Sequence, residues 1–155
     1  MTLFTDDVRR IVKETRLCFA ATINADGTPN LSPKSSLMVY DADHLAFANI
    51  ASPGTVRNLR RNPAIEINAI DIFARRGYRF KGTGEIMGEG TPEYDFVATA
   101  FWGENGKLFP IHEVVKVRVS RVAPVASPAY TFVAGCDESV LRPAYHKKYG
   151  VAPLT

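Results

Sequence analysis

The sequence predicts a mainly β (α+β) fold, in which six antiparallel strands form a closed or partly closed barrel with short helices at its sides. Three observations support this expectation. Most apolar segments have the length or the two-residue alternation of strands, and turn-forming residues separate them closely. The few helical segments do not alternate with strands in the βαβ rhythm of a Rossmann fold. The 155 residues fit a single domain, 1–155.

Three segments have helical character, at 5–15, 52–61 and 92–102, and a fourth short helix is expected at 140–149. In the first segment Val8, Ile11 and Val12 recur at helical spacing, with charged residues between them. The second begins with Ser52 and Pro53, which are a capping residue and a proline at the first helical position.

Six segments are expected to be strands: 17–23, 30–40, 44–50, 64–73, 78–87 and 114–122. Turns are expected at 25–29, at 41–43 and at Arg76-Gly77. Pro33 indicates an edge strand, a bulge or a backbone group left free for another partner. Gly82 and Gly84 predict a bulge or a close approach of two backbones.

The composition favours an ordinary globular protein over a membrane protein or a disordered one. Hydrophobic residues make up 46% and charged residues 23% of the chain. No apolar run approaches the roughly 20 residues of a membrane span. The first sixteen residues are rich in charge, unlike a secretory signal. Cys18 and Cys136 are far apart in sequence and are expected to be reduced thiols, so we expect a cytoplasmic protein.

The charge pattern suits a small anionic ligand. The formal net charge is only +3, yet basic residues cluster at 57–61 and 75–81. A local cluster in a near-neutral chain fits a small anion better than nucleic acid. These arginines and lysines are equally compatible with a solvated face.

The common catalytic motifs are absent from the sequence: it has no dinucleotide-binding glycine motif, P-loop, HExxH, CxxC or nucleophile elbow. The histidines at 44, 112 and 146 lack metal-ligand spacing, so no metal site is expected. Such a chain is either a binding module or a protein whose chemistry comes from a cofactor.

Two segments carry groups that suit an anion. Residues 33–36 (Pro-Lys-Ser-Ser) place a lysine and two hydroxyls within a strand. Residues 49–55 lead from a strand into a helix, whose free N–H groups and positive end attract phosphate. Ser52 and Thr55 add hydroxyls there, and Gly54 allows close approach. Ser52 is also a plausible N-cap without any ligand.

These motifs come in an order that resembles the pyridoxamine 5′-phosphate oxidase-like FMN-binding split-barrel family. The most specific element is a strand, a small or polar turn and then TVRNLRRNP, residues 55–63. The resemblance covers about residues 15–122 and leaves 123–155 as a C-terminal extension. It implies a six-stranded antiparallel split β-barrel and a homodimer with two FMN molecules, each held by both chains.

The resemblance also implies roles for individual residues. It places Lys34, Ser35 and Ser36 along the isoalloxazine and ribityl chain, and the backbone of Ala48, Asn49, Ile50 and Ala51 at the polar edge of the ring. The phosphate would meet Ser52, Gly54 and Thr55. Many relatives carry a basic residue in the last pair, so Lys34 or Arg57 is expected to supply that charge. Arg79, Lys81 and Trp102 would come from the partner chain.

The expected function is an FMN-dependent oxidoreductase that acts by flavin hydride or electron transfer, with NAD(P)H or a small-molecule electron acceptor as its partner. Oxidation of a B6 vitamer is not expected, since LRPAYHKKYG lacks the C-terminal arginine–histidine cluster of the true oxidases. Two alternatives remain: a non-enzymatic FMN electron carrier, or a split barrel that binds haem, a deazaflavin or no cofactor. Dimer packing is expected for the extension.

Overall fold

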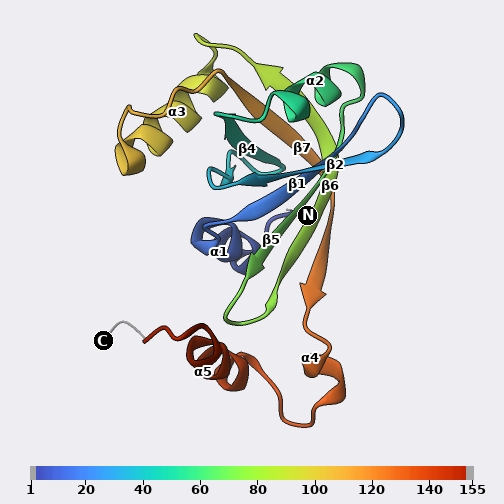
Figure 1. The fold of residues 1–155 in the computed structure, drawn as a ribbon, viewed down its shortest axis with the longest axis vertical. Coiled ribbons are helices and arrows are strands. Elements are labelled where there is room, and N and C mark those ends of the chain that lie inside the picture. The colour runs from blue at the N-terminus through green and yellow to red at the C-terminus, as the bar shows by residue number, and fades with distance from the viewer. Residues whose placement is uncertain (1–2, 153–155) are drawn as a thin grey trace.

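The computed structural model describes residues 3–152, which form one curled antiparallel sheet with helices around it (Figure 1). In chain order the elements are α1 (Asp6–Glu14), β1 (Cys18–Ile23), β2 (Pro29–Lys34), β3 (Met38–Val39), β4 (His44–Asn49), α2 (Pro53–Arg61), β5 (Ala64–Asp71), β6 (Arg76–Met87), α3 (Pro92–Asn105), β7 (Glu113–Ala126), α4 (Ala129–Phe132) and α5 (Glu138–Tyr149).

The sheet has the strand order β2-β1-β5-β6-β7-β4-β3, and every neighbouring pair is antiparallel. Its two edge strands, β2 and β3, are consecutive in sequence and are joined by residues 35–37 alone. The sheet therefore curls into a half-barrel whose edges approach one another. Ser36 ties this junction to β4, because its Oγ accepts a hydrogen bond from the backbone N–H of Ala48 at 2.9 Å.

The expectation of six strands is wrong, since the sheet has seven. The segment expected as one strand, 30–40, divides into β2 and β3. The division has a physical cause: the Ser36 hydroxyl takes the Ala48 N–H that a continuing strand would pair through its backbone. Pro33 lies on the edge strand β2, which pairs only with β1, as its missing N–H requires.

The turn expected at Arg76-Gly77 is also misplaced, because both residues belong to β6 and pair with Asp71 and Ile70 of β5. The chain reverses over residues 72–75 instead. Asp71 Oδ1 accepts hydrogen bonds from the backbone N–H groups of residues 73 and 74, at 2.9 and 3.0 Å. Arg75 then adopts the left-handed conformation at φ 59° and closes the turn.

The bulge predicted from the glycines of the fifth expected strand is confirmed. The β6–β7 register shifts between Lys81 and Gly82. A Cβ on Gly82 would lie 2.1 Å from the carbonyl oxygen of Arg118, so only glycine allows the two backbones to approach this closely.

Two apolar clusters form the core. In the larger one α1 packs its predicted stripe, Val8, Ile11 and Val12, against the curled sheet. In the smaller one α3 covers β4 and β7, chiefly through Val97 and Phe101. Cys18 is buried and Cys136 is half-buried, and both are free thiols. Within residues 3–152, no helix combines the length and apolar character that crossing a membrane requires.

The C-terminal extension lies beyond the end of β7, away from the body of the sheet (Figure 1). β7 runs past its expected end to Ala126, and its proline, Pro124, pairs only with β6. The last helix starts at Glu138, two residues before the expected 140, because the Asp137 side chain caps it. The short α4 was not expected.

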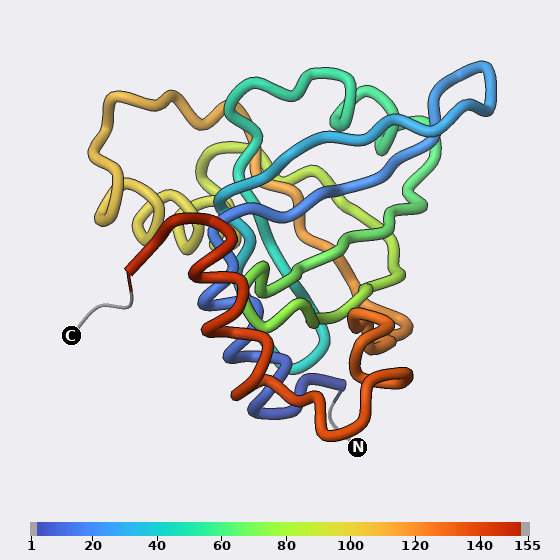
Figure 2. Tube along the Cα trace, turned by 60° about the horizontal axis from the view of Figure 1, so that its bottom comes forward, coloured from blue at the N-terminus to red at the C-terminus, as the bar shows by residue number. Residues whose placement is uncertain are grey.

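Arg76 fastens this extension to the barrel. Its guanidinium contacts Asp7 of α1 at 2.9 Å and Glu138 of α5 at 3.2 Å. Figure 2 shows α5 running past α1 on this side of the molecule. Hydrogen bonds from Arg76 and Tyr78 hold the pKa of Asp7 well below its usual range.

Candidate functional site

A pocket of about 260 Å³ opens where the two edges of the sheet meet. Its walls are the end of β2 with the junction that follows it, and the end of β4 with the loop that leads to α2. The structure thus brings together two segments singled out in the sequence. The lining residues are Ser32, Pro33, Lys34, Ser35, Ser36, Ala48, Ile50, Ala51 and Ser52.

Lys34 is the principal charge of this pocket, and its side chain is almost fully buried, at 5% exposure. Its ammonium donates hydrogen bonds to the hydroxyl of Ser32 and, at 3.2 Å, to the carbonyl oxygen of Pro33. It lies 5.6 Å from the centre of the Phe47 ring. No carboxylate pairs with it among residues 3–152, and burial lowers the pKa of the ammonium. An anion in the pocket would supply the missing partner.

The loop from Asn49 to Ser52 is shaped by the Asn49 side chain. Its amide nitrogen donates to Glu113 at 2.7 Å, and its amide oxygen accepts from both the backbone N–H and the hydroxyl of Ser52, each at 3.0 Å. Ser52 therefore does not cap α2. The first turns of α1 and α3, by contrast, are capped by Thr5 and Thr91. The positive end of α2 starts beside the pocket without a side-chain cap.

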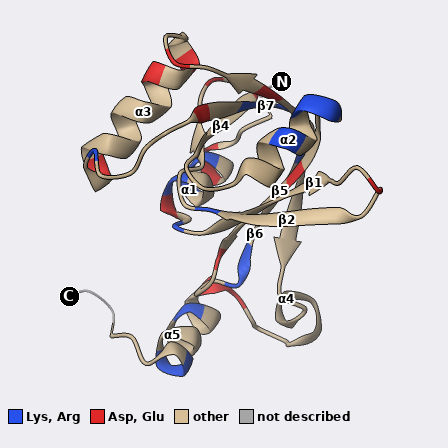
Figure 3. Cartoon of the chain, turned by 45° about the horizontal axis from the view of Figure 1, so that its top comes forward, with Lys and Arg blue, Asp and Glu red and all other residues tan. Residues whose placement is uncertain are grey.

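A second pocket, of about 380 Å³, lies on the other side of the same loop. Ile50, Ala51 and Ser52 line both pockets. Arg57 and Arg60 project from α2 into the second pocket, and Figure 3 shows the basic colouring of this helix. Arg60 pairs with Glu113 at 3.2 Å, whereas Arg57 makes no ion pair within the described part of the chain.

The two remaining residues expected at the phosphate differ in their surroundings. A Cβ added to Gly54 would meet its nearest neighbours, on Asn30 and Arg57, only at 3.7 and 3.8 Å, so this point of the backbone is open. Thr55 is buried, at 1% exposure, and lines neither pocket. Its hydroxyl has no hydrogen-bond partner among residues 3–152, which is unusual for a buried polar group.

The residues expected from a partner chain lie elsewhere on the protomer. Arg79 and Lys81 stand on the outer face of β6 and contact Glu66 of β5 at 3.0 and 3.6 Å. Trp102, on α3, donates its indole N–H to the carbonyl oxygen of Phe109 at 2.9 Å. Neither pocket around the 49–52 loop includes these three residues within one protomer.

Apolar side chains are exposed on the same outer face of the sheet. Phe19 and Ile23 on β1 and Leu31 on β2 are exposed by 42%, 37% and 65%. The strand register places these side chains next to the charged ones. Phe19 pairs with Asn68 of β5, which pairs with Arg79 of β6. Leu31 pairs with Ala21 of β1, which pairs with Glu66 of β5. We call this surface, with Glu66, Arg79 and Lys81, the outer sheet face.

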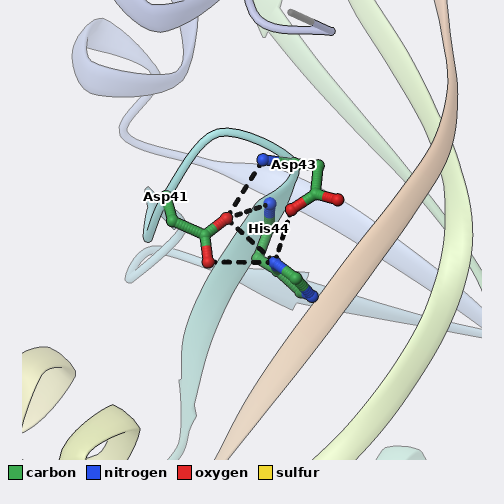
Figure 4. A group of neighbouring side chains, drawn as sticks. All are labelled: Asp41, Asp43 and His44. Carbon is green, nitrogen blue, oxygen red and sulfur yellow. Dashed lines mark hydrogen bonds and ion pairs between the residues drawn. The ribbon is translucent and has the colours of Figure 1, made fainter.

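The sequence analysis missed two features that involve histidine. His112 lines the second pocket, a position set by pairing between β4 and β7 rather than by any local motif. Asp41, Asp43 and His44 also converge, with His44 Nδ1 2.8 Å from a carboxylate oxygen of each aspartate (Figure 4).

The turn itself explains this second cluster. Asp41 Oδ1 accepts hydrogen bonds from the backbone N–H groups of Asp43 and His44, at 3.0 and 2.9 Å. Burial raises the pKa of Asp41, but these hydrogen bonds and the one from the His44 ring outweigh it and lower the pKa. The hydrogen bonds account for the arrangement without a ligand.

Comparisons of the chain with known proteins agree with this architecture. Residues 4–126 match the model of the pyridoxamine 5′-phosphate oxidase family. No curated protein sequence matches the chain. HupZ of Group A Streptococcus is 28% identical, with a TM-score of 0.67; the match covers 80% of this chain and 95% of HupZ.

Two more distant structures share the fold. One, described as an FMN-binding protein from Syntrophomonas wolfei, is 14% identical, with a TM-score of 0.69, and the match covers 79% of this chain and 86% of that one. The other, the haem storage protein HutZ from Vibrio cholerae, is 17% identical, with a TM-score of 0.62, and the match covers 81% and 95%. The family match spans α1 to the end of β7, so the chain belongs to the pyridoxamine 5′-phosphate oxidase family.

Proposed function

We propose that the protein binds FMN in the two pockets around the 49–52 loop and is a flavin-dependent oxidoreductase. The observation that carries this proposal is the buried ammonium of Lys34, which has no carboxylate partner among residues 3–152 and lies in the pocket next to the uncapped start of α2. A buried charge without a counter-ion is costly, and a bound dianion would offset that cost.

The phosphate of FMN is proposed to lie at the start of α2. Backbone N–H groups and the helix dipole favour an anion there, and the backbone at Gly54 is open to approach. Arg57, which makes no ion pair in the described chain, adds a positive charge on the side of the second pocket.

The isoalloxazine and ribityl chain are proposed to lie between residues 34–36 and the backbone of residues 48–51. The hydroxyl of Ser36 accepts from Ala48, so its own hydrogen remains available for the ligand. The pocket here is about 260 Å³, which is below the range of roughly 300–1,000 Å³ typical of small-molecule sites. One protomer therefore offers only part of the enclosure that a flavin needs.

A second copy of the chain is proposed to complete the site. The outer sheet face joins exposed apolar side chains to charges of both signs, a combination that suits a self-complementary interface. Arg79, Lys81 and Trp102 would reach the flavin of the partner protomer. This arrangement explains why these residues lie away from the pocket of their own chain.

In this proposal FMN supplies the hydride or electron transfer, with NAD(P)H as donor or a small molecule as acceptor. The protein binds and orients the cofactor. The pocket that holds Lys34 has no histidine, cysteine or carboxylate in its described lining, so its side chains position the ligand rather than act as acids or bases.

Haem is a second candidate ligand, because His112 lines the second pocket and presents an imidazole beside the same loop. Imidazole is a common axial ligand of haem iron. A deazaflavin would use the same phosphate contacts as FMN, so the ligand has to be released and identified by its spectra.

Heat release of the bound small molecule from purified protein, followed by its absorption and mass spectra, tests the proposal. The released molecule is expected to be FMN. A Soret band would instead identify the ligand as haem, and the mass of a deazaflavin would identify it as that cofactor. Arg57→Glu should weaken FMN binding about ten-fold or more, since it reverses a charge close to the phosphate. Arg61→Glu makes the same change on α2 but lines neither pocket, so it should leave affinity nearly unchanged. Equal effects of the two variants would contradict the phosphate position.

A further inference from the structure

A third pocket, of about 420 Å³, lies between α1, β3 and α3, and we call it the α1–α3 pocket. Its volume is within the range of small-molecule sites. Ser35 and Ser36 line both this pocket and the pocket that holds Lys34. The junction between the edge strands is thus the wall that the two pockets share.

The rim of the α1–α3 pocket is strongly basic. Arg9 and Lys13 lie one helical turn apart on α1, Arg16 follows the end of that helix, and all three line the pocket. Glu104 is the one acidic residue in the described lining, and it contacts Arg16 at 3.3 Å. Arg9 and Lys13 make no ion pair with any residue in 3–152. The rim therefore keeps an excess of positive charge.

Seven apolar side chains form the floor of the α1–α3 pocket, beside the uncharged polar residues Thr15, Ser35, Ser36 and Asn105. Its walls come from the side of α1 that faces the sheet, from the junction with β3, and from α3. The apolar lining residues are Val12, Leu37, Met38, Val39, Phe96, Ala100 and Phe101. An apolar floor beneath a cationic rim is complementary to a molecule with an apolar body and an acidic group at one end.

We propose that the α1–α3 pocket binds a small organic acid, with an aromatic or short aliphatic body on the apolar floor and its anionic group at Arg9 and Lys13. The ligand would contact Ser35 and Ser36 from the side opposite the flavin pocket. This position makes an organic acid the substrate class of the flavin site, and that role, unlike the binding itself, rests on the proposed function.

The binding is testable with 1-anilinonaphthalene-8-sulfonate, which combines an apolar body with one anionic group and fluoresces when it leaves water. The full chain should bind it saturably. Lys13→Glu should weaken binding about ten-fold, because it reverses a charge at the rim. Ala100→Trp should abolish binding, since Ala100 is an exposed residue of α3 and a larger side chain there fills the pocket without disturbing the core.

Two controls separate this pocket from other surfaces. Lys147→Glu, on the exposed part of α5, should leave the probe's affinity unchanged. The uncharged analogue N-phenyl-1-naphthylamine should bind wild type and Lys13→Glu equally, which shows that the variant has kept its fold and its apolar floor. Equal affinity of the sulfonate probe for wild type and Lys13→Glu would overturn the inference, as would unimpaired binding to Ala100→Trp.

FMN content measured on the same samples keeps the two proposals distinct. Protein that lacks affinity for FMN but binds the probe in a Lys13-dependent way supports the organic-acid site and refutes the flavin site. Protein that holds FMN but binds the probe independently of Lys13 refutes the organic-acid site and leaves the flavin site standing.

Discussion

Replacement of Lys34 by methionine should have opposite effects on the stability of the ligand-free protein and on its affinity for FMN. Lys34 is 5% exposed and has no carboxylate partner in the part of the chain that the structure describes. Methionine has a similar shape and carries no charge. The substitution therefore relieves the cost of burying an ammonium and removes the charge proposed to attract FMN.

The magnitudes follow from the contacts. Each unit by which burial lowers the lysine pKa costs the folded state about 1.4 kcal/mol, so the ligand-free variant should unfold at a higher urea concentration than wild type. A hydrogen bond to a charged group contributes about 1.5–3 kcal/mol, which corresponds to a loss of FMN affinity of about 10- to 150-fold.

The pH dependence provides an independent check of the sign. Because the folded-state pKa of Lys34 lies below the ordinary lysine value of 10.5, the unfolded chain binds more protons between those two values. The free energy of unfolding of wild type should therefore rise as pH increases towards 10.5, and this rise should be absent in Lys34→Met. Urea titrations at neutral and alkaline pH measure this change in stability, and quenching of FMN fluorescence measures the affinity for FMN. The control for both assays is Lys147→Met, at an exposed lysine of α5. A variant that is less stable than wild type, or that binds FMN as tightly, would refute the reasoning.

Three further predictions concern the sheet and its attachments. Gly82→Ala should lower the free energy of unfolding by about 1–3 kcal/mol, because the new Cβ would lie 2.1 Å from a carbonyl oxygen, while Gly88→Ala meets nothing within 4 Å and should be near neutral in the same urea titration. Asp7→Asn should flatten the loss of stability that acid titrations of wild type are expected to give below pH 3.8. The hydrogen bond from Arg76 lowers the folded-state pKa of Asp7, so wild type loses that stabilisation as pH falls towards this pKa. Leu31→Asp, at a site 65% exposed, should yield folded monomer in light scattering, and an unchanged mass would exclude the outer sheet face as the dimer interface.

Most elements could be predicted from the sequence because local patterns specify them. The apolar stripe of α1 and the two-residue alternation of β5 match the buried residues of the structure. The start of α3 and the bulge at Gly82 likewise depend on residues that are close in sequence or on a single glycine.

Errors arose where a side chain replaces a backbone interaction. The Ser36 hydroxyl pairs with Ala48 and divides one expected strand into two. The Asp71 carboxylate forms a turn over residues 72–75, ahead of the expected turn at Arg76-Gly77. In both cases the deciding hydrogen bond depends on a side-chain orientation that residue type alone does not specify.

The candidate site was predictable in part. Lys34 and Ser36 were identified as polar residues within an expected strand, and the 49–52 loop as a strand end that leads into a helix. The burial of Thr55 and the position of His112 depend on how α2 and β7 pack, so the sequence held no local signal for them. The α1–α3 pocket joins α1, which ends at Glu14, to α3, which begins 78 residues later at Pro92, and only the folded chain reveals it.

The three-residue connection between β2 and β3 limits how this barrel can diverge. Insertions there would separate the two edges of the sheet and enlarge both adjoining pockets together. Substitutions at 35 and 36 would alter two binding surfaces in a single mutational step. A change of ligand preference in this scaffold should therefore be accompanied by altered residue types at 35–37 while the length of the connection is kept.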